Sequence, residues 1–268
     1  MKMKQIQSNE ITLAISPCPN DTFMFWAMLH ARVDTFGMSF KPIFRDIAQL
    51  NQAATEQEFD VVKISYAHYP SIAAAYELLD SGSALGFGNG PLLVSRSEID
   101  VRELPHLLIA IPGVNTTANK LLTLACPQAA NRREYLFSEI EEAVLTHKAD
   151  AGLLIHETRF TYAQKGLKKI IDLGEFWEKK TGGLPLPLGA IAVKRSLPEK
   201  IKQNLNTALR HSIEHAMQNP RKPEKFIAEH AKEMDMEVCR KHINLYVNEF
   251  SVALGERGRK AVEELLAR

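Results

Sequence analysis

Residues 152–162, GLLIHETRFTY, place a histidine and a glutamate directly after an apolar run typical of a buried strand. Histidine has the side-chain pKa closest to neutrality, so His156 is the best candidate for a general base. The alternative is a core histidine whose polar atoms are satisfied by the backbone. Glu157 can orient the imidazole ring or pair with Arg159. Orientation requires the strand to have ended by His156, because successive strand side chains point to opposite faces.

Two further segments combine polar groups with expected strand ends. Lys63 lies among apolar residues in DVVKISY, where a lysine needs a partner or a cleft; it can pair with a ligand carboxylate or extend to solvent. Thr116 and Thr117 follow a strand and a glycine and begin an expected helix. Helix N-termini attract carboxylates through unsatisfied N–H groups, so both threonines are candidate ligands for an acidic small molecule, with plain helix capping as the alternative.

The loop SPCPNDT, residues 16–22, follows the first expected strand and contains two prolines that make it rigid. Asn20, Asp21 or Thr22 can cap the next helix, and a rigid loop at a strand end is suited to building a site. Asn20 and Asp21 are therefore candidate cleft residues. Cys18 is expected to be buried and inert, because nothing near it in sequence other than a helix N-terminus would activate its thiol.

The spacing of the cysteines and histidines indicates no metal site. Three scattered cysteines form neither a disulfide framework nor a Cys-x-x-Cys pair. His211 and His215 have the i, i+4 spacing of metal ligands but lack the H-E-x-x-H frame. Gly86, Gly88 and Gly90 lack the G-x-G-x-x-G spacing of a dinucleotide-binding loop. We therefore expect no metal and no cofactor.

Length and composition restrict the class of protein. The 268 residues suit two modest α/β domains, and a net charge of +1 gives no electrostatic case for nucleic acid. The N-terminal segment lacks a secretory core, and no run of about 18 apolar residues occurs. Reduced cysteines and the absent export signal predict a cytoplasmic protein. The expected partner is a small-molecule substrate, without nucleic acid or membrane, and a homodimer is left open.

These candidate residues must be positioned by strands that alternate with helices along the chain. Such alternation implies a parallel sheet. A glycine-dense turn within residues 81–96 and the segment 181–195 are natural places for the chain to pass between lobes. A helix is expected around residues 71–79, and helices from Pro198 onward. The expected strands are residues 11–16, 38–46, 59–66, the apolar parts of 81–96 and 105–112, 151–156 and 168–173.

Six segments together resemble the 1,4-dihydroxy-6-naphthoate synthase family of the futalosine route to menaquinone. They are SPCPNDTFMFWA, KISYAHYP, ALGFGNGPLLVSR, TTANKLL, LLIHETRFTY and LGEFWEKKTGGLPLPLGAIAVKR, in order over nearly the whole chain. The resemblance implies an α/β fold similar to type II periplasmic binding proteins, with two lobes around a ligand cleft. We expect a larger lobe from residues 1–94 and 192–268 and a smaller lobe from residues 95–191.

The resemblance also implies a cofactor-independent carbon–carbon lyase that converts cyclic dehypoxanthine futalosine into 1,4-dihydroxy-6-naphthoate. His156 matches the catalytic base of the family. The substrate-binding positions match Val61, Val62, Lys63, Thr116 and Thr117. Other members can carry a hydroxyl at the position of Val62, so only its backbone is expected to contact the substrate.

Two other functions fit the same fold. A solute-binding protein would also need strand-end loops and a carboxylate site, but the absent export signal argues against transport. Chorismate dehydratase acts in the same pathway, and the His-Glu pair in LLIHETRFTY favours the later enzyme. A binding protein would return its ligand unchanged, whereas either enzyme would turn over its own substrate.

Overall fold

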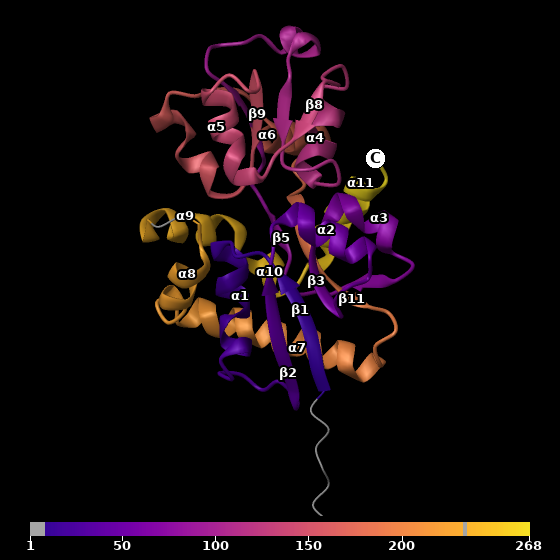
Figure 1. Ribbon diagram of the computed structural model, residues 1–268. Coiled ribbons are helices and arrows are strands. Elements are labelled where there is room, and N and C mark those ends of the chain that lie inside the picture. The colour runs from indigo at the N-terminus through magenta and orange to yellow at the C-terminus, as the bar shows by residue number, and fades with distance from the viewer. Residues whose placement is uncertain (1–8, 233–234) are drawn as a thin grey trace, which may run out of the picture.

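The computed structural model describes residues 9–232 and 235–268, which form two α/β lobes, each built on its own sheet (Figure 1). The larger lobe contains a six-stranded sheet in the order β2-β1-β3-β11-β4, with β5 also paired to β11. The predicted two-lobe α/β architecture is confirmed. The strands of this sheet are β1 (Asn9–Ile15), β2 (Met38–Phe44), β3 (Val61–Ser65), β4 (Tyr76–Leu78), β5 (Ala84–Gly86) and β11 (Leu186–Lys194).

The smaller lobe is built on a five-stranded sheet in the order β10-β6-β9-β7-β8. Its strands are β6 (Leu92–Ser95), β7 (Ile109–Ile111), β8 (Arg132–Glu134), β9 (Ala151–Leu154) and β10 (Lys168–Asp172). Its helices are α4 (Thr117–Ala125), α5 (Ile140–Leu145) and α6 (Leu173–Thr181). Short 3₁₀ helices complete it: η2 (Val101–His106), η3 (Phe137–Glu139), η4 (His156–Phe160) and η5 (Tyr162–Lys165).

The other helices belong to the larger lobe and cover both faces of its sheet. Ile11, Leu13 and Ile15 pack on one face with apolar residues of α1 and α7, while Ala14 and Val62 belong to the core on the other face. This alternation along β1 is the period-two pattern of a strand buried on both sides. The helices are α1 (Pro19–Leu29), α2 (Ile47–Thr55), η1 (Tyr66–His68), α3 (Tyr69–Ile72), α7 (Glu199–Gln218), α8 (Glu224–His230), α9 (Met236–Tyr246), α10 (Glu249–Val252) and α11 (Gly255–Leu266).

The expectation of a parallel sheet is wrong for part of each lobe. In the larger sheet, β1 pairs in parallel with β2 and β3, but β11 runs antiparallel to β3, β4 and β5. In the smaller sheet, β6 is antiparallel to both β9 and β10. The reason is that β6 and β11 each follow a crossing between the lobes. They therefore enter their sheets without the crossover helix that makes neighbouring strands parallel.

The helix expected around residues 71–79 is also wrong. Helix α3 ends at Ile72, and the following residues form strand β4, which pairs with β11. Tyr76 is fully buried there, and its hydroxyl donates to the carbonyl of Phe59 at 2.6 Å. Sheet pairing and burial thus override an apolar pattern that suits either structure. Strand β8 and helix α6 were not predicted from the sequence.

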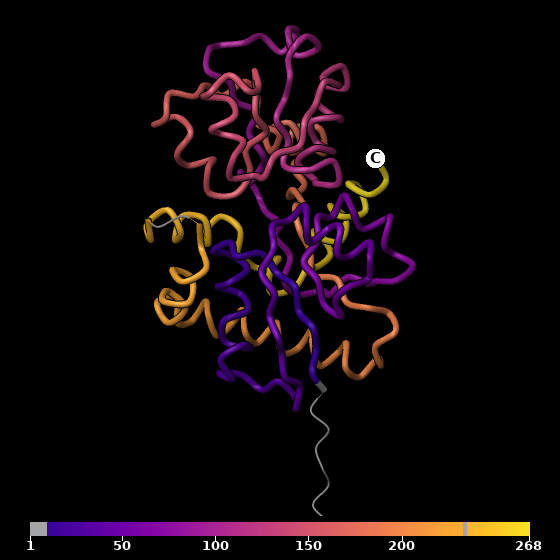
Figure 2. Tube along the Cα trace, in the orientation of Figure 1, coloured from indigo at the N-terminus to yellow at the C-terminus, as the bar shows by residue number. Residues whose placement is uncertain are grey.

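The chain passes between the lobes twice, once between β5 and β6 and once between α6 and β11 (Figure 2). The exact boundaries after residues 94 and 191 stay predictions. Among the helices of the described residues, none combines the length and the apolar character needed to span a membrane.

Gly90, in the first crossing, packs directly against the backbone of Gly174 at the start of α6. A Cβ atom at Gly90 would overlap the backbone N and Cα atoms of Gly174, and backbone cannot move aside as a side chain can. We expect Gly90→Ala to lower the free energy of unfolding by about 3 kcal/mol. Urea unfolding followed by circular dichroism measures this, with Ser97→Ala on the exposed end of the same segment as the control. An unchanged midpoint for Gly90→Ala would contradict the packing described.

Candidate active site

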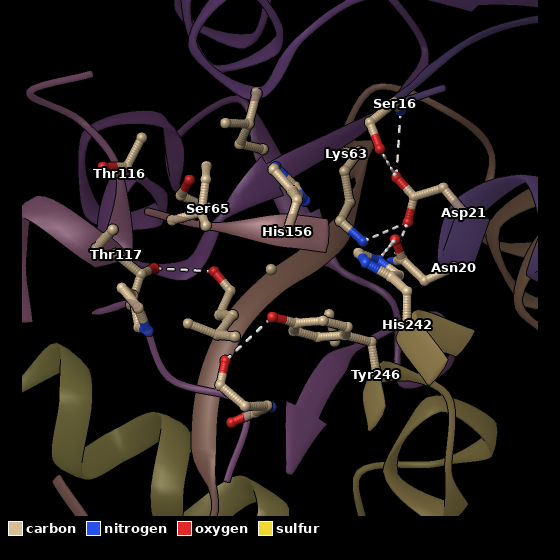
Figure 3. Close-up of a pocket in the computed structure, with 18 residues that line it drawn as sticks. Ser16, Asn20, Asp21, Lys63, Ser65, Thr116, Thr117, His156, His242 and Tyr246 are labelled. Carbon is tan, nitrogen blue, oxygen red and sulfur yellow. Dashed lines mark hydrogen bonds and ion pairs between the residues drawn. The ribbon is translucent and has the colours of Figure 1, made fainter. Parts of the chain in front are cut away.

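A cavity lies between the lobes, where strands from both sheets end (Figure 3). Its polar lining includes Ser16, Asp21 and Lys63 from the larger lobe and Thr116, Thr117 and His156 from the smaller lobe. Ligands of open α/β sheets bind in crevices at the carboxyl ends of strands. The structure therefore brings most of the candidates together in one place, although they are spread over 140 residues of sequence.

His156 enters the cavity from the turn after β9. The strand ends at Leu154, and His156 begins η4 with a φ of +59°. The strand has therefore ended by His156, which is the condition for Glu157 to lie near the ring. Left-handed backbone is unfavourable for a residue with a Cβ atom, and such strain concentrates at functional sites. The backbone conformation at His156 thus places its imidazole in the wall of the cavity, at a cost in conformational free energy.

The imidazole of His156 is neutral at physiological pH. Burial is the main cause that lowers the pKa of His156, to about 4; Asp21 opposes the shift, and Lys63 and Lys232 add to it. Its Nδ1 atom lies 3.4 Å from Sγ of Cys18. Burial, with Glu157 as the next cause, raises the pKa of Cys18 well above its ordinary value. Cys18 is therefore a protonated thiol, as expected, and His156 keeps a lone pair that can accept a proton.

Lys63 and Asp21 form a buried ion pair in the wall of the cavity. The Nζ atom of Lys63 lies 2.7 Å from Oδ1 of Asp21, and their side chains are 6% and 0% exposed. Oδ2 of Asp21 accepts from the backbone N and the hydroxyl of Ser16, at 3.2 and 2.8 Å. Oδ1 also accepts from Nδ2 of Asn20 at 2.9 Å. Lys63 therefore does not extend to solvent, and its charge is balanced within the protein.

The rigid loop after β1 starts its helix earlier than expected. Cys18 is the N-cap residue and makes no capping hydrogen bond through its side chain, and Pro19 occupies the first helical position. Asn20, Asp21 and Thr22 are therefore in the first turn and do not cap the helix, which corrects that expectation. The reason is that proline fits the first position of a helix, where its missing N–H group costs nothing.

Thr116 and Thr117 line the cavity at the start of α4. The Thr116 hydroxyl donates to the carbonyl of Gly113 at 2.7 Å and accepts from the N–H of Asn119 at 3.2 Å. The Thr117 hydroxyl donates to the carbonyl of Leu188 at 2.8 Å and accepts from the N–H of Ala67 at 3.2 Å. Both hydroxyls are engaged with the backbone. The first N–H groups of α4, which a helix cannot satisfy internally, are thus the donors that this end of the cavity offers to an anion.

Removing the cap of α4 should loosen this end of the cavity. We expect Thr116→Ala to lower the free energy of unfolding by about 1 kcal/mol, because the N–H of Asn119 loses its acceptor. Thr116→Ser keeps an acceptor at the same place and should stay close to the wild type. Thermal unfolding of the three proteins tests the assignment, and equal losses in both variants would show that the cap contributes nothing.

The remaining predicted positions, Val61, Val62, Glu157 and Arg159, are not among the residues that line the cavity. The side chains of Val61 and Val62 are buried in the two apolar cores and do not line the cavity, so their contact with substrate stays a prediction. Glu157 is buried behind His156, 3.9 Å from Nδ1 of His242. Arg159 donates to the carbonyl of Gly90 at 2.9 Å and lies 3.7 Å from Asp172, so it braces the first crossing between the lobes.

His242 and Tyr246, both on α9, line the cavity and were not predicted. The Nε2 atom of His242 lies 3.0 Å from Oδ1 of Asn20, and Tyr246 donates to the backbone carbonyl of Asn89 at 3.3 Å. Burial lowers the pKa of His242 well below its ordinary value, and burial raises the pKa of Tyr246 to about 12. Their spacing with Cys239 and Ile243 marks one buried helix face. That pattern is a signal for core packing and gives no reason to choose a functional site.

Comparisons with known proteins agree over almost the full chain. A family model described as menaquinone biosynthesis matches residues 11–268. A 1,4-dihydroxy-6-naphthoate synthase of Thermus thermophilus is 42% identical over 257 residues, covering 96% of this chain and 93% of the relative. A protein of the same name from Streptomyces coelicolor is also 42% identical, covering 98% and 94%.

Solved structures give the same picture of the fold. A crystal structure of a protein from Archaeoglobus fulgidus has a TM-score of 0.91 at 36% identity and covers 97% of both chains. The alkanesulfonate-binding protein of Xanthomonas axonopodis pv. citri, bound to MOPS, has a TM-score of 0.68 at 12% identity, covering 88% and 84%. The predicted likeness to periplasmic binding proteins is therefore confirmed at the level of the fold.

Proposed function

This chain belongs to the menaquinone biosynthesis family, and we propose that it catalyses the reaction for which its curated relatives are named, the formation of 1,4-dihydroxy-6-naphthoate. The substrate in this proposal is cyclic dehypoxanthine futalosine, and the reaction is a carbon–carbon bond cleavage. The observation that carries it is a neutral histidine at the end of a strand, in the wall of a cavity between two lobes. That arrangement suits a single proton transfer to a positioned base.

In the proposed mechanism His156 removes a proton from a hydroxyl group, or from the activated carbon, of the substrate. The electron pair left behind then drives a retro-aldol-like cleavage of the adjacent carbon–carbon bond. The sugar-derived fragment departs, and aromatisation of the second ring makes the reaction favourable. The proton stays on His156 until it returns to product or solvent. No cofactor enters this sequence, because the substrate supplies the electrons and the protein supplies position and one base.

The N-terminus of α4 is the proposed anchor for the aryl carboxylate of the substrate. The alternative anchor, Lys63, is already paired with Asp21 at 2.7 Å, so a second carboxylate would add net negative charge to a buried site. The start of α4 carries unsatisfied N–H groups and the positive end of the helix dipole. Closure of the lobes over the bound substrate would exclude water from the reactive intermediate.

The proposed reaction takes place in the cytoplasm, which agrees with a cysteine content too low and too scattered for a disulfide framework. The lobe boundaries stay proposals: residues 1–94 and 192–268 for the larger lobe and residues 95–191 for the smaller. The two crossings come a few residues before these boundaries, ahead of β6 and β11. A homodimer stays a prediction, to be tested by light scattering.

Incubation of the purified protein with cyclic dehypoxanthine futalosine tests the proposal, with the product followed by chromatography and mass spectrometry. Formation of 1,4-dihydroxy-6-naphthoate would support it. A parallel incubation with chorismate tests the dehydratase activity, which should give no product. Recovery of futalosine-derived ligand intact, together with tight binding in calorimetry, would favour a binding protein and overturn the proposal.

A further inference from the structure

Three side chains with metal-binding atoms meet around His156, the one of the three that lines the cavity. Cys18, His156 and Glu157 each offer one such atom, and the three atoms lie within 4.8 Å of one another. Sγ of Cys18 and Nδ1 of His156 are 3.4 Å apart. Cys18 comes from the loop after β1, whereas the other two residues begin η4. The cluster therefore combines both lobes in one group of potential ligands.

The spacing of this cluster fits a tetrahedral zinc ion. Zinc bonds of about 2.3 Å to sulfur and about 2.0 Å to nitrogen, at a tetrahedral angle, place the two ligand atoms about 3.5 Å apart. Cys18 and His156 already have that separation. The ligand oxygen of Glu157 lies within 4.8 Å of both atoms, so it would have to approach them for all three to bind one ion. Thiolate, imidazole and carboxylate together are a donor set that zinc accepts, and a water molecule would take the fourth position.

The geometry points to an inhibitory zinc site formed by Cys18, His156 and Glu157. Zn²⁺ would bind Sγ, Nδ1 and one carboxylate oxygen, and the thiol proton of Cys18 would pass to the buffer, because a coordinating thiol is deprotonated. The site is distinct in role from the proposed reaction, which uses no metal. It makes this enzyme a target of free zinc.

Zinc at this position would abolish the base function of His156. A neutral imidazole has one lone pair, and coordination through Nδ1 uses it while Nε2 carries the proton. Neither nitrogen could then accept a proton from substrate, whichever of the two faces it. This consequence rests on the proposed function, whereas metal binding itself does not.

Cobalt absorption tests the metal site without any substrate. Addition of CoCl₂ to the wild-type protein should produce a thiolate-to-cobalt charge-transfer band in the near ultraviolet, together with the visible bands of tetrahedral cobalt. Cys126→Ala removes another buried cysteine, at the end of α4, and should leave the band unchanged. Cys18→Ala should abolish it. No band in the wild type, or an equal band in Cys18→Ala, would overturn the proposal.

Zinc titration gives the second readout. In calorimetry with ZnCl₂, Cys18→Ala should weaken binding by about 100-fold or more, since loss of an outer partner alone costs 10- to 100-fold. Glu157→Gln should keep the cobalt charge-transfer band but bind zinc more weakly. If Cys18→Ala does not fold, judged by circular dichroism, Cys18→Ser keeps the size of the side chain and replaces the soft ligand.

Inhibition is measured last, with each variant compared to its own activity without metal. Micromolar ZnCl₂ should inhibit the wild type, and EDTA should restore it, while Cys18→Ala should resist zinc. A cobalt band without zinc inhibition would keep the metal site but overturn its inhibitory role, and with it the argument that bound zinc disables His156 as the base. An absent band refutes the site, whatever the activity shows.

Discussion

Replacing His156 with alanine should lower kcat on cyclic dehypoxanthine futalosine by at least about 100-fold, with little change in KM. General-base catalysis contributes about 10²- to 10⁴-fold to a rate. A residue that acts only on the transferred proton contributes little to ground-state binding. The neutral state of His156 and its position in the cavity wall place it in that class. Steady-state kinetics with product quantified by mass spectrometry measure the loss.

Backbone strain at His156 calls for a second variant. Alanine retains a Cβ atom at a φ of +59°, whereas asparagine adopts left-handed backbone more readily than most residues and its amide cannot act as a base. His156→Asn should therefore fold at least as well as His156→Ala and be equally inactive. His211→Ala, on the exposed side of α7, should retain full activity. Turnover near the wild-type rate in His156→Asn would rule out the base assignment.

Replacing Lys63 with methionine should lower the free energy of unfolding by about 3 kcal/mol. The Asp21 carboxylate is fully buried and would lose its cation. Removal of one partner of a buried ion pair costs about 3 to 5 kcal/mol. The low end is expected because Ser16 and Asn20 still donate hydrogen bonds to the carboxylate. Urea unfolding provides the measurement.

Removing both charges separates the cost of an unpaired charge from the cost of lost packing. Lys63→Met combined with Asp21→Asn leaves no uncompensated charge, so the double variant should recover most of the lost stability. Arg102→Met breaks an exposed pair with Asp100 and should leave stability unchanged. If the double variant were as unstable as Lys63→Met alone, packing of the lysine stem and not charge would explain the loss.

Sequence patterns predicted the local parts of this structure well. The apolar runs located β1, β2, β3, β7 and β9. The segments after β1, β7 and β9, together with Lys63 within β3, supplied candidates that do line the cavity. These predictions succeeded because hydrophobic periodicity and turn residues act over a few positions of chain. His156 could be selected for the same reason, since the end of β9 and the residue after it are both visible in a ten-residue window.

Features that depend on distant contacts could not be predicted. Cys18 and His156 are 138 residues apart, and a spacing rule for metal ligands or dyads does not reach that far. His242 follows 86 residues later on a helix whose buried face reads as core. Strand β4 exists because β11 pairs with it after the chain returns from the other lobe. In each case the residues in contact are separated in the sequence by a passage of the chain between the lobes. Their order along the chain therefore does not indicate that they touch.

The proposed base and the ion pair belong to different lobes, and this division has a consequence for timing. His156 sits on the smaller lobe, while Cys18, Asp21 and Lys63 sit on the larger one. The proposed carboxylate anchor at the start of α4 also lies on the smaller lobe, so substrate would settle first on that lobe. The larger lobe, with its Lys63–Asp21 pair, would complete the wall of the cavity only on closure. His156 would then be shielded from water only in the closed form, and the rate at which the lobes close would set an upper limit on productive turnover.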